Sequence, residues 1–144
     1  MDISFAALTL EQHTNNQTEE FTLDWSGANN PLWIVRKDAT TIEELKGDKQ
    51  PIGLSHITTP FKQHKITLQK GDSIYLFTDG FADQFGGVEK SGGKKFMYRR
   101  LKELILSIQD LPLKEQEVKL VSVLNKWKGE FEQLDDICIM GVRF

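Results

Sequence analysis

The first 78 residues alternate between hydrophobic and polar positions in the way that is typical of β-strands. The clearest case is residues 21–26, where Phe21, Leu23 and Trp25 alternate with polar side chains, the period of a half-buried strand. Strands are expected at residues 2–10, 21–26, 32–37, 62–69 and 73–78. The turn chemistry of residues 27–31 suggests that the strand at 32–37 returns beside the one before it.

The polar segments between these strands are expected to be loops. Residues 11–19 read as a long hairpin loop, and residues 38–60 as a loop with at most a short strand or two. Lys70–Asp72 is a tight turn, and the glycine-rich residues 86–95 are expected to be a mobile loop, because they lack P-loop spacing.

The hydrophobic period changes to that of α-helices after residue 95. The first helix is expected at residues 96–108, with an apolar face made of Met97, Leu101, Leu104, Ile105 and Ile108. Pro112 suits the first turn of a second helix, and Gly129 suits its C-terminal cap. The apolar face of that helix is expected to contain Leu113, Leu120, Val121, Leu124 and Trp127.

Residues 137–144 are apolar on both faces and are therefore expected to form a central strand. The order of these elements, several strands followed by two helices and a last strand, predicts an α+β fold: an antiparallel sheet or sandwich with flanking helices. The length of 144 residues predicts a single domain, 1–144.

Composition and charge narrow the functional classes. The net charge is −3, so a nucleic-acid partner is not expected, and the basic residues Lys94, Lys95, Arg99 and Arg100 read as a solvated helix face. The chain shows no signal peptide or membrane-spanning stretch, which predicts a soluble, cytoplasmic domain with no membrane contact. The single cysteine, Cys138, lies in an apolar strand and is expected to be a buried, inert thiol.

Two acidic features follow or precede apolar strands. Asp79-Gly80, with Asp83 close behind, follows one strand, and Asp135-Asp136 precedes the last. If the two strands are neighbours, these carboxylates converge, and oxygen ligands without cysteine or histidine favour Mg²⁺ or Mn²⁺. Gly80 would also let its carbonyl approach an ion closely.

An ordinary explanation of the same residues stays open. Asp-Gly is a common turn, and Asp-Asp before a strand is often a solvated loop end. The other candidates are weaker: His13, His56 and His64 do not fall at metal-binding spacing, and Trp25, Trp33 and Trp127 read as core residues.

Four motifs resemble one protein family. "GDSIYLFTDGFADQF" at 71–85 is similar to the "GD-x-L-x-L-Y-T-D-G-x-x-E" signature of PPM-type protein phosphatases, in particular the bacterial branch named after stage II sporulation protein E. "SGANNPLWIVR" at 26–36, "QPIGL" at 50–54 and "QLDDICIMGVRF" at 133–144 resemble three further motifs of that branch. The four occur in the family's order and spacing, so the resemblance covers nearly the whole chain.

The resemblance implies a β-sandwich flanked by helices that binds two Mn²⁺ or Mg²⁺ ions. In such enzymes a metal-activated water, and no catalytic side chain, attacks a phosphoserine or phosphothreonine of a protein substrate. Asp79 then corresponds to a metal ligand, Asp135 to a second, and Asp136 is the other candidate for that second position. Asp83 stands where the family usually has Glu and would act through a water. An upstream sensor or receiver domain, as in two-component signalling, is the implied partner.

The sequence also departs from the family. Cys138 stands where Thr is usual, and the family's N-terminal "GGD-x-x-D" motif, whose Asp bridges the two metals, has no counterpart. The chain therefore resembles the C-terminal two-thirds of a phosphatase domain. We expect weak metal binding, little or no phosphatase activity of this chain itself, and self-association through uncovered apolar sheet surface. The alternative is a non-catalytic, phosphatase-like interaction module in a signalling protein.

Overall fold

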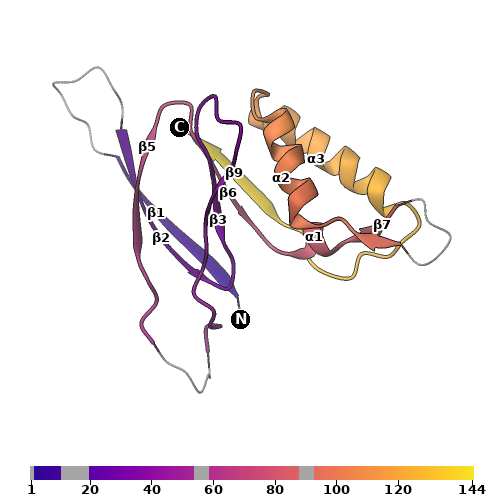
Figure 1. The fold of residues 1–144 in the computed structure, drawn as a ribbon, viewed down its shortest axis with the longest axis horizontal. Coiled ribbons are helices and arrows are strands. Elements are labelled where there is room, and N and C mark those ends of the chain that lie inside the picture. Colours follow the sequence, from indigo (N-terminus) through magenta and orange to yellow (C-terminus); the bar gives the residue numbers. More distant parts are fainter. Residues whose placement is uncertain (1, 11–19, 54–58, 88–92) are drawn as a thin grey trace. The chain divides into compact units, whose positions relative to one another are not determined.

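A computed structural model describes residues 2–10, 20–53, 59–87 and 93–144, and the chain divides into two compact units (Figure 1). Unit 1 comprises Met1–Leu76 and Met140–Phe144, and unit 2 comprises Phe77–Ile139. The single domain predicted for residues 1–144 stays a prediction. The strands are β1 (Ile3–Leu10), β2 (Glu20–Ala28), β3 (Leu32–Val35), β4 (Glu43–Leu45), β5 (His64–Gln69), β6 (Ser73–Phe77), β7 (Phe85–Gly86), β8 (Lys94–Lys95) and β9 (Ile139–Arg143). The helices are α1 (Gly80–Asp83), α2 (Tyr98–Ile108) and α3 (Leu113–Lys128).

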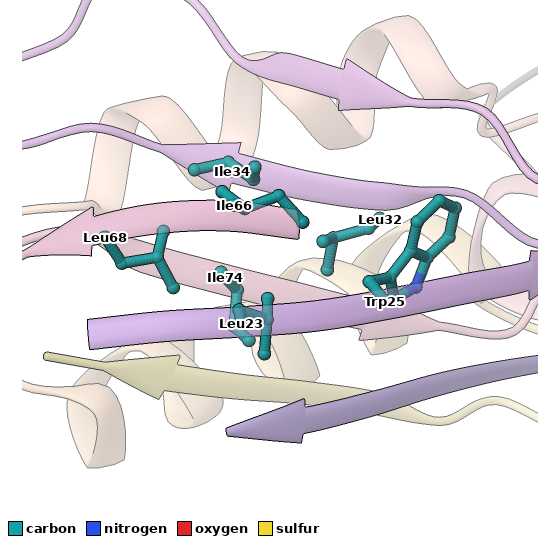
Figure 2. Close-up of a cluster of buried hydrophobic side chains, with 7 residues drawn as sticks. All are labelled: Leu23, Trp25, Leu32, Ile34, Ile66, Leu68 and Ile74. Atoms are coloured by element: carbon teal, nitrogen blue, oxygen red, sulfur yellow. The ribbon is translucent and has the colours of Figure 1, made fainter. Parts of the chain in front are cut away.

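Unit 1 is built on two sheets, with strand orders β1-β2-β5 and β4-β3-β6-β9. The paired strands β1 and β2, β2 and β5, β3 and β4, and β3 and β6 are all antiparallel. Side chains from both sheets form one buried cluster, shown in Figure 2: Leu23, Trp25, Leu32, Ile34, Ile66, Leu68 and Ile74. The alternation predicted at residues 21–26 is confirmed, since Leu23 and Trp25 point into this cluster. The antiparallel sheets and the helices confirm the predicted α+β class.

β3 does not return beside β2 as the sequence suggested. It lies in the other sheet, between β4 and β6, and all four of its residues are buried. The turn before it is closed by a distant loop: Asp48 N–H donates to the Gly27 carbonyl at 2.8 Å, and Asn29 N–H donates to the Asp48 carbonyl at 2.9 Å. A Cβ at Gly27 would overlap the Asn30 carbonyl and the Trp25 ring, so this crossing between sheets requires glycine.

The last strand is not central, and this expectation was wrong. Within the described residues β9 has β6 on one side only and forms the end of its sheet. Cys138, just before β9, is exposed, so the prediction of a buried thiol was wrong as well. Met140 is 56% exposed. An apolar sequence shows that a strand can be buried, but the exposure of the strand depends on which other strands pair with it.

Arg36 and Asp72 join two of the motifs noted in the sequence. Asp72 Oδ2 accepts hydrogen bonds from Arg36 Nη1 at 2.9 Å and from Gln69 N–H at 3.0 Å, and its Oδ1 accepts from Lys37 N–H at 2.9 Å. Burial raises the pKa of Asp72, but the N–H donors and the Arg36 guanidinium outweigh it and hold that pKa below its usual range. The Asp72 side chain is only 5% exposed and holds together the segments that contain Arg36 and Gln69. We call this interaction the Arg36–Asp72 clamp.

Unit 2 contains the α2–α3 pair, which lie beside each other in Figure 1, and the short β7–β8 hairpin. Both predicted helices are confirmed, with two differences. Met97 has a positive φ of 75° and is exposed just before α2, and Val121 faces solvent. Gln116 is buried instead, because its Nε2 donates to the Gln109 and Leu111 carbonyls at the turn between the helices. Among the described residues no helix combines the length and apolar character needed to cross a bilayer.

Lys94, Lys95, Arg99 and Arg100 are exposed, as the sequence predicted, but the predicted helix face was wrong for two of them: Arg99 and Arg100 lie on α2, whereas Lys94 and Lys95 form β8. Lys95, Arg99 and Arg100 each contact a different neighbouring side chain. Arg99 lies 3.7 Å from Glu103, and the guanidinium of Arg100 lies over the Trp127 ring at 4.5 Å. Of the glycine-rich segment, residues 88–92 lie outside the described residues, as do the predicted hairpin loop at 11–19, His13 and His56.

Candidate metal and phosphate site

The turn after β6 is shaped by a single helical turn. Asp79 is the N-cap residue of α1, and its carbonyl accepts a hydrogen bond from Asp83 N–H at 2.9 Å. Phe81 and Ala82 anchor the turn because both are buried, Phe81 with its ring edge-on to Phe96 at 5.1 Å. The exposed carboxylate of Asp79 makes no capping hydrogen bond to α1. Helix capping therefore does not explain why an aspartate occupies this position.

Thr78 joins this turn to the second acidic segment. Its hydroxyl donates to the Asp136 carbonyl at 2.7 Å and accepts from Cys138 N–H at 3.0 Å. Thr78 N–H donates to the Cys138 carbonyl at 3.0 Å. These three bonds hold side by side two segments that are almost sixty residues apart in sequence, which confirms that the two strands are neighbours.

Gly80 makes this approach possible. A Cβ at Gly80 would overlap the Asp136 carbonyl oxygen and would lie 3.0 Å from the carbonyl carbon of Asp136 and 3.1 Å from Ile137 Cγ1. Any side chain at position 80 would therefore push the two segments apart. The glycine serves the contact between segments, and a role for its carbonyl as a metal ligand stays a prediction.

A pocket of about 150 Å³ opens beside this junction. Its lining residues are Gly80, Asp83, Gln84, Phe85, Lys95, Leu134 and Asp135. The structure thus brings together three of the residues singled out in the sequence: Gly80, Asp83 and Asp135. Asp79 and Asp136 are exposed on the joined segments next to it, but they do not belong to this lining.

Asp135 is better oriented than Asp136. One of its carboxylate oxygens, Oδ1, accepts the Asp136 N–H at 2.8 Å, and its carbonyl accepts from Gln133 Nε2 at 2.9 Å. A carboxylate fixed through one oxygen presents the other in a defined direction, which is how outer hydrogen bonds orient metal ligands. This geometry favours Asp135 over Asp136 as a ligand.

Sequence reasoning missed two further pocket residues. Lys95 donates to Asp83 Oδ2 at 2.8 Å, and both side chains are 43% exposed. Gln84 is buried, and its Nε2 donates to the Glu132 carbonyl at 2.9 Å, which ties the pocket to the segment leading to Asp135. The sequence groups Lys95 with its basic neighbours, and only the pairing of β7 with β8 shows that it faces Asp83.

The oxygen atoms at this site are of the type that a divalent ion prefers, but too few of them come together to surround one. The candidates are carboxylate and carbonyl oxygens, which Mg²⁺ and Mn²⁺ prefer. Among the described residues, however, no three acidic, histidine or cysteine side chains come together as a metal-binding group. Asp79 and Asp135, the carboxylates that the resemblance suggests as ligands, would by themselves complete only part of a coordination sphere, and their role as ligands stays a prediction.

Comparison with known proteins supports the resemblance noted in the sequence. The sequence model of the family "Stage II sporulation protein E" matches residues 5–144. The chain is similar in structure to the SiaA-PP2C domain of Pseudomonas aeruginosa, with a TM-score of 0.73 and 32% identity over 88% of this chain and 51% of that chain. No curated protein matched with significance.

The phosphatase domain of the cell fate determinant SpoIIE from Bacillus subtilis has a similar fold. In its manganese-presoaked structure the TM-score is 0.52 at 16% identity, over 97% of this chain and 56% of that chain. A second structure of that domain gives a TM-score of 0.52 at 15% identity. The chain spans about half the length of each of these structures. Because the family match covers nearly the whole sequence, both segments joined by Thr78 included, the chain belongs to the stage II sporulation protein E family of PPM-type phosphatases.

Proposed function

We propose that this chain is part of a metal-dependent serine/threonine protein phosphatase domain. The observation that carries the proposal is the junction at Thr78, which places the Asp79 turn and the Asp135 segment at one pocket. Family membership supports a hydrolase of phosphate esters, and the oxygen-only donor set supports Mn²⁺ or Mg²⁺ over zinc. The phosphoserine or phosphothreonine specificity rests on the family resemblance.

In this proposal Asp79 and Asp135 hold the ion, and Asp136 and the Gly80 carbonyl are the secondary candidates. A bound Mn²⁺ or Mg²⁺ would supply Lewis-acid polarisation of the phosphoryl group and lower the pKa of a coordinated water. Thr78 and Gly80 position the two ligand segments, because one bonds them together and the other lets their backbones meet. Asp83 stays outside the direct ligand set, because Lys95 already neutralises it.

The chain on its own is proposed to be weakly active or inactive. Two carboxylates offset little of the repulsion between two closely spaced dications, and no three acidic side chains of the described residues come together at one point. Catalysis would therefore need ligands from residues outside this set. The proposed setting is a cytoplasmic signalling protein in which a sensor or receiver domain controls this output domain.

The test compares the full-length protein with the 144-residue chain, using a phosphoserine peptide with Mn²⁺ or Mg²⁺. We expect metal-dependent hydrolysis by the full-length protein, with a loss of about a hundredfold or more in Asp79→Asn and Asp135→Asn, since each removes a ligand of the ion that activates the nucleophile. Asp110→Asn, an exposed residue between α2 and α3, is the matched control and should be unchanged.

Two outcomes would contradict this proposal. Hydrolysis that is unaffected by chelation or by Asp135→Asn would exclude the assigned ligands. A folded full-length protein that binds a phosphoprotein but does not hydrolyse it under any metal condition would favour the non-catalytic interaction module.

A further inference from the structure

Two strands of unit 1 are apolar on both faces and yet lie at the outside of their sheets. β9 is one of them, and β1 is the other. Ala6 and Leu8 of β1 lie on the face that Trp25 and Leu23 share, and Phe5 lies on the opposite face. Among the described residues β1 pairs with β2 alone and β9 with β6 alone. Strands with apolar side chains on both faces are typical of the interior of a sheet.

The hydrophobic core is open along these two strands. Leu8 pairs with the buried Leu23 and therefore faces the core, but it is 45% exposed. On β9 Val142 and Phe144 pack against the buried cluster, so Met140 faces the same way by alternation, and it is 56% exposed. Figure 2 shows β1 and β9, indigo and yellow in the colours of Figure 1, along the same margin of this cluster. We call the side formed by β1 and β9 the open side of unit 1.

The opposite side, formed by β5 and β4, is closed by a side chain. Arg36 Nη1 donates to the Thr67 carbonyl of β5 at 2.8 Å, and Arg36 Nη2 lies 3.1 Å from Glu43 Oε2 of β4. These two strands also carry the charged residues Lys65, Glu43 and Glu44, and charges on edge strands discourage the pairing of a further strand. One side of unit 1 is therefore protected against strand addition.

The open side has little of this protection. The sequence of β1, ISFAALTL, contains no charged residue and no proline. The only charged residue of β9 is Arg143, and its Nε donates to the Ser73 hydroxyl of the neighbouring β6 at 3.1 Å. An apolar edge of this kind is a template for pairing with another extended segment.

We propose that the open side is a docking surface for β-strands from the other half of the phosphatase domain in the full-length protein. The length of the relatives carries the choice of this occupant. The match to the SiaA-PP2C domain covers 88% of this chain but only 51% of that domain, so about half of it has no counterpart in these 144 residues. For the SpoIIE domain the shares are 97% and 56%.

The docking is strand addition to both sheets. One extended segment pairs with β1 and another with β9, and each carries apolar residues at every second position, facing Leu8 and Met140. Main-chain hydrogen bonds supply the affinity, and the alternating side chains fix the register. No metal ion and no ligand residue takes part, so the docking surface does not rest on the proposed function.

The test is amide hydrogen exchange of the full-length protein and of the 144-residue chain, the latter at a dilution where sedimentation shows a monomer. The amides of β1 and β9 should exchange about tenfold or more slowly in the full-length protein, because docked strands bond or cover them. The amides of β4 and β5 should exchange equally in both, because Arg36 already closes that side. The slowing should not depend on protein concentration.

Met140→Lys places a charge among the core-facing side chains of the open side. In the 144-residue chain it should leave the exchange rates unchanged, because Met140 is 56% exposed and a lysine there reaches solvent. In the full-length protein it should speed exchange in β1 and β9 about tenfold, because an inward-pointing charge opposes strand addition. Met140→Leu should exchange like the wild type. Thr67→Lys, at an exposed position of β5, is the matched control and should leave both proteins unchanged.

Equal exchange of β1 and β9 in the full-length protein and the chain would overturn the docking surface. Slowing of all four edge strands alike would also overturn it, as would equal effects of Met140→Lys and Thr67→Lys. Slowing that grows with the concentration of the full-length protein would show that a second copy is the occupant, and it would overturn the proposal as well. A full-length protein with slowed exchange in β1 and β9 but no metal-dependent hydrolysis would instead support the docking surface and overturn the proposed function.

Discussion

The Arg36–Asp72 clamp in unit 1 gives the most quantitative prediction. The change is Asp72→Ala, which removes the acceptor of two part-buried backbone N–H groups, those of Lys37 and Gln69. A buried unsatisfied donor costs about 1–3 kcal/mol, and these two should lie at the lower end of that range because Lys37 and Gln69 are exposed residues. Arg36 also loses a partner, but its side chain is 37% exposed and still pairs with Glu43 at 3.1 Å, so this loss adds under about 1 kcal/mol.

The expected total is therefore about 2–4 kcal/mol lost from the free energy of unfolding, a large share of the roughly 5–15 kcal/mol that holds a domain together. Asp72→Asn should cost less, about 1–2 kcal/mol, because its amide oxygen still accepts one of the N–H groups. Urea unfolding followed by circular dichroism measures both values.

Acid should remove the same contribution in the wild type. The pKa of Asp72 is lower in the folded chain than in the unfolded chain, so its carboxylate stabilises the fold above about pH 4, its ordinary pKa. That contribution is lost as the pH falls through the lower, folded-state pKa. The difference between wild type and Asp72→Asn should therefore be constant near neutral pH and shrink as the pH falls below the ordinary aspartate pKa of about 4 and through the lower folded-state pKa.

Asp38→Asn is the control, because it removes the same charge from an exposed position whose φ of 59° suits asparagine. Equal losses in Asp72→Asn and Asp38→Asn would show that the clamp does not stabilise the fold. A difference between wild type and Asp72→Asn that persists undiminished in acid would show that it is not the carboxylate charge that matters.

Four other predictions concern the site and the sheet edges. Gly80→Ala should cost about 1–3 kcal/mol and weaken Mn²⁺ binding, since its Cβ separates the joined segments; unchanged thermal unfolding would contradict this. Thr78→Val should cost about 1–3 kcal/mol, whereas Thr78→Ser keeps the hydroxyl and should retain most of the stability; equal losses would exclude the hydrogen bonds as the cause. Gln84→Leu should destabilise by about 1 kcal/mol by leaving the Glu132 carbonyl without its donor, and a neutral result in urea unfolding would count against that role. The exposed Phe5 and Met140 on the terminal strands β1 and β9 predict concentration-dependent self-association in sedimentation, and a monomer at all concentrations would refute it.

The elements were predictable because their signals are local. The alternation around Trp25 and the helical spacing around Leu101 depend on neighbours within a few residues, and both are confirmed. Which sheet a strand joins is a different matter. β2 and β5 share one sheet while β3 and β6 share the other, and neither the turn before β3 nor the turn before β6 signals a change of sheet.

The site was predictable only in outline. Its two acidic segments are predictable from their places next to apolar strands, but the residues alone favour the turn explanation over the ligand explanation. Thr78 and Lys95 were missed because each acts through a partner distant in sequence, Asp136 and Asp83 respectively. The exposure of Cys138 was missed for the related reason that apolar composition does not reveal where a sheet ends.

The junction at Thr78 also has a consequence for folding kinetics. It closes a loop of nearly sixty residues, and closing such a loop in an unfolded chain costs about 3–4 kcal/mol of entropy before any constant term. The α2–α3 pair lies inside this loop and shortens the span that must be closed once it has formed. The candidate site should therefore assemble late in folding, and substitutions that loosen these helices should slow its formation although they touch none of its ligands.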